Sequence, residues 1–184
     1  MAPALTLTFD DGPDPTWTSR VLDALKEEGA TAIFFVMALR AAEHPELIDR
    51  ARAEGHAVEF HCTRHVRHTE STEQEVRDDT AAGLERLASI GVHPTRWRTP
   101  YGIVAPFTPE IAAVHGLELT GWSADSHDWI GAGAEAMLAS IESDLAPGAV
   151  VLMHDGIGLV SGARTAAKPW TSCTRSANWR VGAI

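Results

Sequence analysis

Two adjacent carboxylates, Asp10 and Asp11, end the first apolar run of the chain, Leu5–Phe9. The run has the length and composition of a buried strand, and Gly12-Pro13 breaks it at once. Neighbouring carboxylates repel each other, so a folded protein keeps them together only with compensation. That compensation is a metal ion, a nearby arginine or a proton shared between the two groups. Because the rest of the chain has candidates for the first two, the pair predicts a chemically active site.

A pair of histidines supplies candidates for the metal. His61 and His65 are four residues apart, so one helical turn or a tight loop can direct both imidazoles toward one ion. Together with Asp11 they form a set of two histidines and one carboxylate, which suits Zn²⁺ or a similar divalent ion and leaves positions for water and substrate. A hydrated polar loop is the alternative interpretation of the histidine pair taken alone. Between them, Cys62 fits a small buried residue better than a thiolate ligand.

Further polar residues with chemical capacity follow the later strand-like runs. They are Arg98 at the end of residues 96–98, Asp125, Asp128 and Trp129 after 117–122, and His154 and Asp155 after 149–153. In parallel sheets with helical connections, ligands bind at the carboxyl ends of the strands. We therefore expect these residues to share one site with the acidic pair and the histidines.

Strand-like and helix-like segments alternate along the chain. Apolar or β-branched runs typical of strands cover residues 5–9, 31–36, 57–61, 96–98, 117–122 and 149–153. Helical periodicity covers residues 17–28, 45–54, 72–90 and 134–145, and Thr108-Pro109-Glu110 opens one more helix. Thr72 and Glu75 have the spacing of a capping box. Repeated βα units predict a parallel sheet with helices outside it, either an open doubly wound sheet or a closed barrel.

Composition excludes several other classes of protein. A chain of 184 residues with 45% apolar content builds one sizeable core, so we expect one domain. The net charge of −10 argues against nucleic acid or an anionic membrane as the main partner. No apolar stretch is long enough to span a bilayer. Two cysteines, Cys62 and Cys173, imply no disulfide framework.

The first residues carry neither a basic segment nor a long apolar segment of a secretory signal. The sequence as written therefore predicts a cytoplasmic protein, or a secreted one if a leader was removed from it.

The polar segments together resemble the motifs of the polysaccharide deacetylases, the NodB-homology family or carbohydrate esterase family 4. The resemblance covers roughly residues 5–156, and all five family motifs occur in order. They are Thr8-Phe9-Asp10-Asp11-Gly12-Pro13, His61-x-x-x-His65, Arg98-x-Pro100-Tyr101-Gly102, Asp125-x-x-Asp128-Trp129 and Leu152-x-His154. The second motif departs from the family at Cys62, where serine or threonine is usual.

The resemblance implies a distorted (β/α) barrel that hydrolyses N-acetyl, sometimes O-acetyl, groups of amino sugars or oligosaccharides. By this analogy Asp11, His61 and His65 bind a divalent metal, with Zn²⁺ expected first, although Co²⁺, Ni²⁺ and Fe²⁺ suit the same ligands. Asp10 is then the general base on metal-bound water, and Arg98 is its ion-pair partner.

The other motif residues acquire roles from the same resemblance. His154 is the general acid that protonates the leaving amine, and Asp128 orients it and keeps it cationic. The backbone N–H of Tyr101 helps to hold the oxyanion. Leu152 and Trp129 form an apolar pocket for the acetyl methyl group, with ordinary core packing as the second interpretation of Leu152. Tyr101 and Trp129 also offer ring faces to a sugar.

The end of the chain departs from the family. Residues 1–160 form the expected deacetylase domain, whereas residues 161–184 are basic and have no helical or alternating apolar period. We interpret this atypical tail as a disordered segment or as the product of a reading-frame shift near Ala167. In either case the helix and strand that close the barrel are missing or altered.

Two alternative functions remain open at this stage. One is an amidase of the same fold that acts on a formyl group or on a cyclic ureide or imide, which the lack of an export signal favours. The other is an inactive remnant that binds metal or sugar without turnover, which the atypical tail favours. The presence of every expected catalytic residue, from Asp10 to His154, argues against the remnant.

Overall fold

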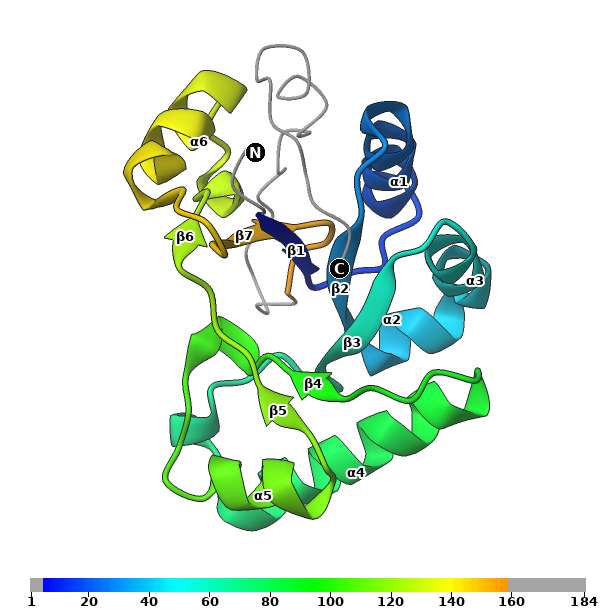
Figure 1. Ribbon diagram of the computed structural model, residues 1–184. Coiled ribbons are helices and arrows are strands. Elements are labelled where there is room, and N and C mark those ends of the chain that lie inside the picture. The colour runs from blue at the N-terminus through cyan, green and yellow to red at the C-terminus, as the bar shows by residue number, and fades with distance from the viewer. Residues whose placement is uncertain (1–4, 159–184) are drawn as a thin grey trace.

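A computed structural model describes residues 5–158, and its central element is a curved parallel sheet (Figure 1). The strands are β1 (Thr6–Asp10), β2 (Ala32–Met37), β3 (Ala57–Cys62), β4 (Arg96–Trp97), β5 (Glu118–Leu119), β6 (Ala124–Asp125) and β7 (Val150–His154). Their order is β5-β4-β3-β2-β1-β7-β6, and every pairing is parallel. The expected distorted (β/α) barrel is confirmed as a parallel sheet of seven strands curled into a half-barrel.

Helices lie around the outer side of this sheet (Figure 1). They are α1 (Trp17–Glu28), α2 (Ala38–Glu43), α3 (Pro45–Ala53), α4 (Glu73–Ser89), α5 (Thr108–Val114) and α6 (Ala134–Ile141). Short 3₁₀ turns are η1 (His68–Glu70), η2 (Pro100–Gly102), η3 (Asp128–Ile130) and η4 (Glu142–Asp144). The sequence pattern predicts all the α-helices except α2, which directly follows β2 and is too short to show a helical period.

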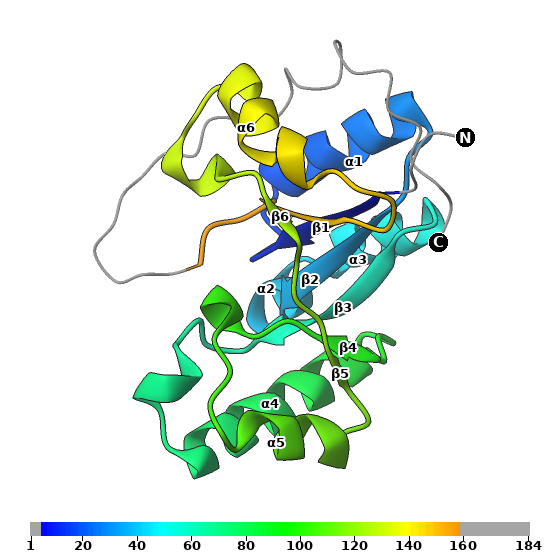
Figure 2. The ribbon, with the colours of Figure 1, turned by 60° about the vertical axis from the view of Figure 1, so that its left-hand side comes forward.

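The segment from β5 to β6 crosses between the two edges of the sheet (Figure 2). The sequence pattern predicts one strand over residues 117–122, whereas the structure forms two short strands with different partners. The Thr120 N–H donates to the Trp97 carbonyl of β4 at 2.9 Å, and the Ser123 N–H donates to the Val150 carbonyl of β7 at 2.9 Å. The apolar run is therefore divided because its two halves pair with opposite edges.

Local sequence signals account for where the helices begin and end. Gly29 adopts φ 61° at the C-terminus of α1, a left-handed conformation that glycine accepts without steric cost. The capping box of α4 is confirmed, because Thr72 Oγ1 accepts from the Glu75 N–H while the Glu75 carboxylate accepts from the Thr72 N–H at 2.8 Å. These caps pair backbone groups that the helix itself leaves unbonded.

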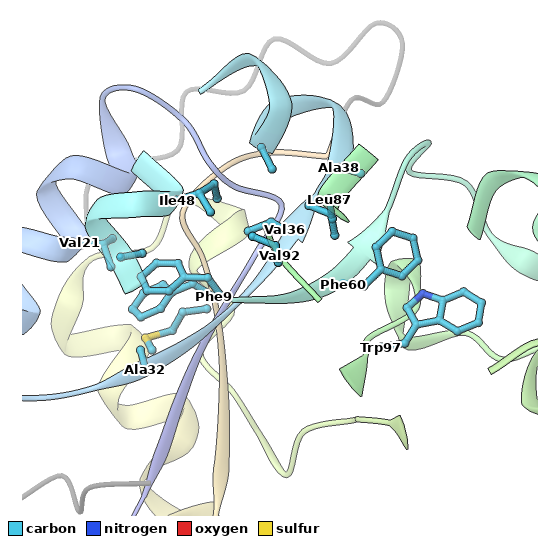
Figure 3. Packing of buried hydrophobic residues seen from close by; sticks show 14 of the residues in the cluster. Phe9, Val21, Ala32, Val36, Ala38, Ile48, Phe60, Leu87, Val92 and Trp97 are labelled. Carbon is cyan, nitrogen blue, oxygen red and sulfur yellow. The ribbon is translucent and has the colours of Figure 1, made fainter. Parts of the chain in front are cut away.

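Large aromatic side chains lie among the mainly aliphatic residues of the core between the sheet and the helices (Figure 3). Phe9 of β1 stacks on Phe34 of β2 with ring centroids 5.3 Å apart. Phe60 and Trp97 extend the core toward β4, with centroids 5.8 Å apart. Burying each of these large side chains contributes roughly 1.5–3 kcal/mol, so the core fixes the strands whose carboxyl ends carry the polar residues.

Glu59 of β3 holds the short strand β4 in place. Its carboxylate accepts the backbone N–H groups of Thr95 and Arg96, both at 2.8 Å. The indole N–H of Trp97 also donates to the His61 carbonyl at 2.9 Å. A strand of two residues has few ladder hydrogen bonds, so these contacts determine where the following residue, Arg98, lies.

Several expectations fall beyond residue 158. The domain boundary at 160, the tail 161–184 and the altered closing helix and strand lie outside the described residues. Within residues 5–158, no helix has both the length and the apolar character needed to cross a bilayer.

The packing of α4 on β3 predicts an unusual response at Gly83. Alanine normally stabilises a helix interior over glycine by about 0.5–1 kcal/mol. At Gly83, however, a Cβ atom would lie 2.6 Å from both the Phe60 ring and Thr63 Oγ1. We expect Gly83→Ala to lower the free energy of unfolding by about 1–3 kcal/mol in urea titrations.

The neighbouring exposed Ala82 provides the control for this substitution. Ala82→Gly should cost only the helix propensity difference of about 1 kcal/mol. A stabilising effect of Gly83→Ala would contradict the close packing of α4 on β3.

Candidate active site

The carboxyl ends of β1, β3, β4 and β7 bring the predicted polar residues together. Parallel pairing of β1 with β7 places Asp10 directly beside His154. Asp11, His61 and His65 meet in front of these strand ends, with Nε2 of the two histidines 3.1 and 3.3 Å from Asp11 Oδ1. The fold thus brings five of the predicted residues to one place, namely Asp10, Asp11, His61, His65 and His154.

Asp11, His61 and His65 form a candidate metal centre. One ligand atom from each residue lies within 4.8 Å of the other two. Asp11 Oδ1 and His61 Nε2 are buried and make no hydrogen bond among the described residues. Buried polar atoms are normally paired, so unpaired atoms that converge on one point fit a cation between them.

The backbone fixes which His61 nitrogen is free for a metal. Nδ1 of His61 lies 2.6 Å from the Arg98 carbonyl, which accepts a hydrogen bond and requires the proton to be on Nδ1. The lone pair of Nε2 is then directed at Asp11 Oδ1. Metal-binding histidines commonly have this arrangement, in which the second ring nitrogen is held by a carbonyl or carboxylate.

Electrostatics favours the metal-binding form of Asp11 and of His65, but not that of His61. Burial would raise the pKa of Asp11, but the close approach of His61 and the charges of the two histidines outweigh it and hold that pKa far below its usual value. Burial lowers the pKa of His65 to about 4, so its imidazole is neutral at pH 7. For His61, Asp11 and Asp10 overcome burial and raise the pKa, so a metal competes there with a proton.

Asp10 pairs with the fully buried Arg98. The guanidinium donates to Asp10 Oδ1 at 2.8 Å, to Thr8 Oγ1 at 2.7 Å and to the Gly121 carbonyl at 2.8 Å. It also lies over the Phe35 ring, 4.2 Å from its centroid. Burial raises the pKa of Asp10 above its usual value, and the charge of Arg98 is the largest influence opposing that rise.

His154 and Asp128 form a second pair on the other side of Asp10. Asp128 Oδ1 lies 2.8 Å from His154 Nδ1, and Oδ2 accepts the His154 backbone N–H at 2.7 Å. Burial would lower the pKa of His154, but the hydrogen bond and charge of Asp128 raise it to about 9. His154 is therefore a protonated imidazole at neutral pH, positioned beside a carboxylate whose own pKa is also raised.

Tyr101 contacts this centre through His65, and Trp129 directly follows Asp128 in η3. Tyr101 has φ 59° and its ring contacts the His65 ring at 4.5 Å, while the Arg67 guanidinium lies over the Tyr101 ring at 4.1 Å. Arg67 therefore covers one face of the Tyr101 ring, which we had expected to be available for stacking on a sugar. Trp129 is 57% exposed in η3, and its ring lies beside the His127 ring, with centroids 6.1 Å apart.

Leu152 is buried and alternates with two core residues. Val151 and Met153 belong to the hydrophobic core, so Leu152 and His154 face the opposite side of the strand. That side carries the polar centre, which favours the acetyl-pocket interpretation over ordinary core packing.

Two acidic residues that were expected in the shared site, Asp125 and Asp155, form hydrogen bonds outside it. Asp125 accepts the His127 N–H at 2.8 Å and thereby stabilises its own turn. Asp155 is buried, accepts a hydrogen bond from Thr18 Oγ1 at 2.6 Å and has a pKa raised to about 7 by burial.

The sequence did not predict a role for Arg40, whose side chain donates a hydrogen bond to the backbone carbonyl of Asp11. No local pattern marks it, because an arginine in a short helix is usually a surface residue.

Comparisons with known proteins agree with this geometry. The family model described as polysaccharide deacetylase matches residues 2–120. A chitooligosaccharide deacetylase from Bradyrhizobium sp. (strain ANU 289) is 40% identical over 152 residues, covering 82% of this chain and 69% of the relative. A peptidoglycan-N-acetylglucosamine deacetylase from Bacillus cereus is 32% identical over 154 residues, covering 83% and 72%. The family 4 carbohydrate esterase from Streptomyces lividans, solved with acetate, has a TM-score of 0.78 and 31% identity, covering 83% and 79%.

The Asp128 contact predicts a titration shift that is measurable without any substrate. In Asp128→Asn an amide oxygen can still accept from Nδ1, but the negative charge is lost. We expect the pKa of His154, followed by imidazole NMR, to fall from about 9 toward the ordinary value of 6.5.

Asp125→Asn is the matched control. It removes a carboxylate of the same loop, but this carboxylate accepts a hydrogen bond from the His127 N–H and not from His154. An unchanged His154 pKa in Asp128→Asn, or an equal fall in Asp125→Asn, would contradict the assigned pair.

Proposed function

The chain belongs to the polysaccharide deacetylase family, and we propose that it is a metal-dependent hydrolase that removes N-acetyl groups from amino-sugar oligosaccharides. The observation that carries this proposal is the meeting of Asp10, Asp11, the two histidines and His154 at one end of the sheet. The relatives named as chitooligosaccharide and peptidoglycan deacetylases support an N-acetylated sugar as substrate. Some O-acetyl esters have the same geometry at the carbonyl and belong to the same proposal.

Asp11, His61 and His65 are assigned to the metal. One carboxylate and two imidazoles suit Zn²⁺ first, and Co²⁺, Ni²⁺ or Fe²⁺ as alternatives. When bound there, the ion supplies a Lewis acid that lowers the pKa of water and polarises the acetyl carbonyl.

Asp10 is assigned as the general base. Its burial raises its proton affinity above that of an ordinary carboxylate, while Arg98 opposes premature protonation. A carboxylate in this condition accepts the proton of the attacking water more readily than a solvated one. The buried contacts of Arg98 to Thr8 and Gly121 keep the guanidinium fixed, so Asp10 keeps one orientation.

His154 is assigned as the general acid. With its pKa at about 9 it carries a proton at neutral pH and gives that proton to the leaving amine. Asp128 orients the ring through Nδ1, which leaves Nε2 as the donor. Asp10 and His154 thus have separate roles although they lie side by side at the ends of β1 and β7.

The remaining assignments concern the acyl group. The backbone N–H of Tyr101 is assigned to the developing oxyanion, where a fixed donor is worth about 2.7–4 kcal/mol in other hydrolases. Leu152 and Trp129 are assigned to the acetyl methyl group. Leu152 is two residues from His154 on the same side of β7, and the exposed Trp129 directly follows Asp128.

Acetate release from N-acetylglucosamine oligomers tests the proposal. Metal-stripped protein is assayed with and without added Zn²⁺ or Co²⁺, and Asp10→Asn is compared with Asp23→Asn, a surface carboxylate paired with Arg50. We expect metal to restore release, Asp23→Asn to match the wild type, and Asp10→Asn to lose about 10²–10⁴-fold in kcat.

Several outcomes would contradict the proposal. Activity in Asp10→Asn equal to the wild type would remove the assigned base. Release that does not depend on metal would remove the metal. Release of formate or of a ring-opened acid from other amides, with no acetate from the sugar, would replace the substrate class.

A further inference from the structure

Arg40 joins the ends of two neighbouring strands at the candidate metal centre. It lies in α2, and its guanidinium donates from Nη1 to the Asp11 carbonyl and from Nη2 to the Ile157 carbonyl, both at 2.7 Å. Asp11 directly follows β1, and Ile157 lies in the segment that follows β7. One side chain therefore ties together the two loops that leave β1 and β7.

The segment after β7 in turn fixes the carboxylate of Asp11. The Gly158 N–H donates to Asp11 Oδ2 at 2.6 Å, although the two residues are 147 positions apart in the chain. With Oδ2 occupied, Oδ1 is the oxygen left toward His61 and His65. The Gly158 contact thus decides which carboxylate oxygen is presented to an ion.

The segment Gly156–Gly158 is packed too closely against the ligands to move independently. A Cβ atom on Gly156 would lie 2.6 Å from the Asp11 carbonyl, and one on Gly158 would lie 2.7 Å from ring atoms of His65. Both glycines are buried. Small displacements of this segment are therefore transmitted to Asp11 and His65 alike.

Asp11 needs such support because of its backbone. It has φ 73°, in the left-handed region that residues other than glycine adopt rarely and at a cost of about 1–3 kcal/mol. Such conformations persist where surrounding contacts hold them. The Arg40 hydrogen bond to the Asp11 carbonyl acts on this same residue.

We propose that Arg40 is a positioning residue for the metal centre. Its two hydrogen bonds hold the segment 156–158 against Asp11, so that Gly158 occupies Oδ2 and Oδ1 faces the histidines. Arginine suits this task because its fork presents two donors at a fixed separation, whereas lysine offers one point of charge. The inference rests on the proposed function, because it assumes that Asp11, His61 and His65 hold a divalent ion.

Zinc affinity of the full chain tests this role directly. The dissociation constant for Zn²⁺ is measured by competition with a chromophoric chelator at fixed pH for the wild type, Arg40→Gln and Arg40→Lys. We expect Arg40→Gln to weaken binding about 10–100-fold, as removal of groups that orient metal ligands does elsewhere. Arg40→Lys should lie between the two, because it keeps one donor.

Arg50→Gln is the matched control for a purely structural effect. Arg50 also bonds a backbone carbonyl, that of Ser19, together with Asp23 and Glu54, but it lies on α3 away from the centre. We expect it to lower the thermal midpoint of the metal-free protein without changing zinc affinity. Equal zinc affinity in Arg40→Gln and the wild type, or equal loss in Arg50→Gln, would overturn the inference.

Two further measurements separate the remaining outcomes. If Arg40→Gln does not fold, as judged by circular dichroism, Gly158→Ala tests the same segment, and unchanged zinc affinity there overturns the inference. A wild type that binds zinc and releases no acetate contradicts the proposed function while the affinity comparison still decides the role of Arg40. A wild type that binds no zinc overturns both.

Discussion

The buried ion pair between Arg98 and Asp10 is the interaction on which the rest of the centre depends. A guanidinium with no exposed surface is costly to bury unless its donors are matched, and here they reach Asp10, Thr8 and Gly121. The carbonyl of the same residue fixes the tautomer of His61. Arg98 therefore links β1, β3 and the segment that crosses from β5 to β6. The same residue therefore connects neighbouring parts of the sheet and orients the polar side chains at its carboxyl end.

The two adjacent carboxylates have different neighbours, and their pKa values are shifted in opposite directions. Asp10 lies beside Arg98 and His154, and burial raises its pKa. Asp11 turns to the histidines through a left-handed backbone, and its pKa is lowered. In a regular strand, neighbouring side chains point to opposite faces. The departure from strand geometry at Asp11 thus separates the two carboxylates, as the proposed roles of base and ligand require.

Short sequence patterns correctly predicted the features that depend on residues close together in the chain. Gly29 marks the end of α1, Thr72 and Glu75 mark the start of α4, and the polar residues at strand ends predicted the shared site. The division of 117–122 between β5 and β6 depends on partners far away in the chain, so no local pattern contains it. The same holds for Arg40, whose acceptors belong to the ends of β1 and β7. His56 and His68, whose burial no local pattern predicts, are also buried. His68 is held by Thr108 at 3.0 Å, a contact across 40 residues.

Locating a bound metal ion would show which of the two carboxylates is its ligand. Anomalous diffraction at the zinc absorption edge, from crystals of the full chain grown with Zn²⁺, places the ion without reference to activity. We expect one strong peak about 2.0–2.3 Å from Asp11 Oδ1, His61 Nε2 and His65 Nε2, with Gly158 still bonded to Asp11 Oδ2. A fully loaded protein with its peak elsewhere, or with Asp10 among the ligands, would contradict the division of roles between the two carboxylates.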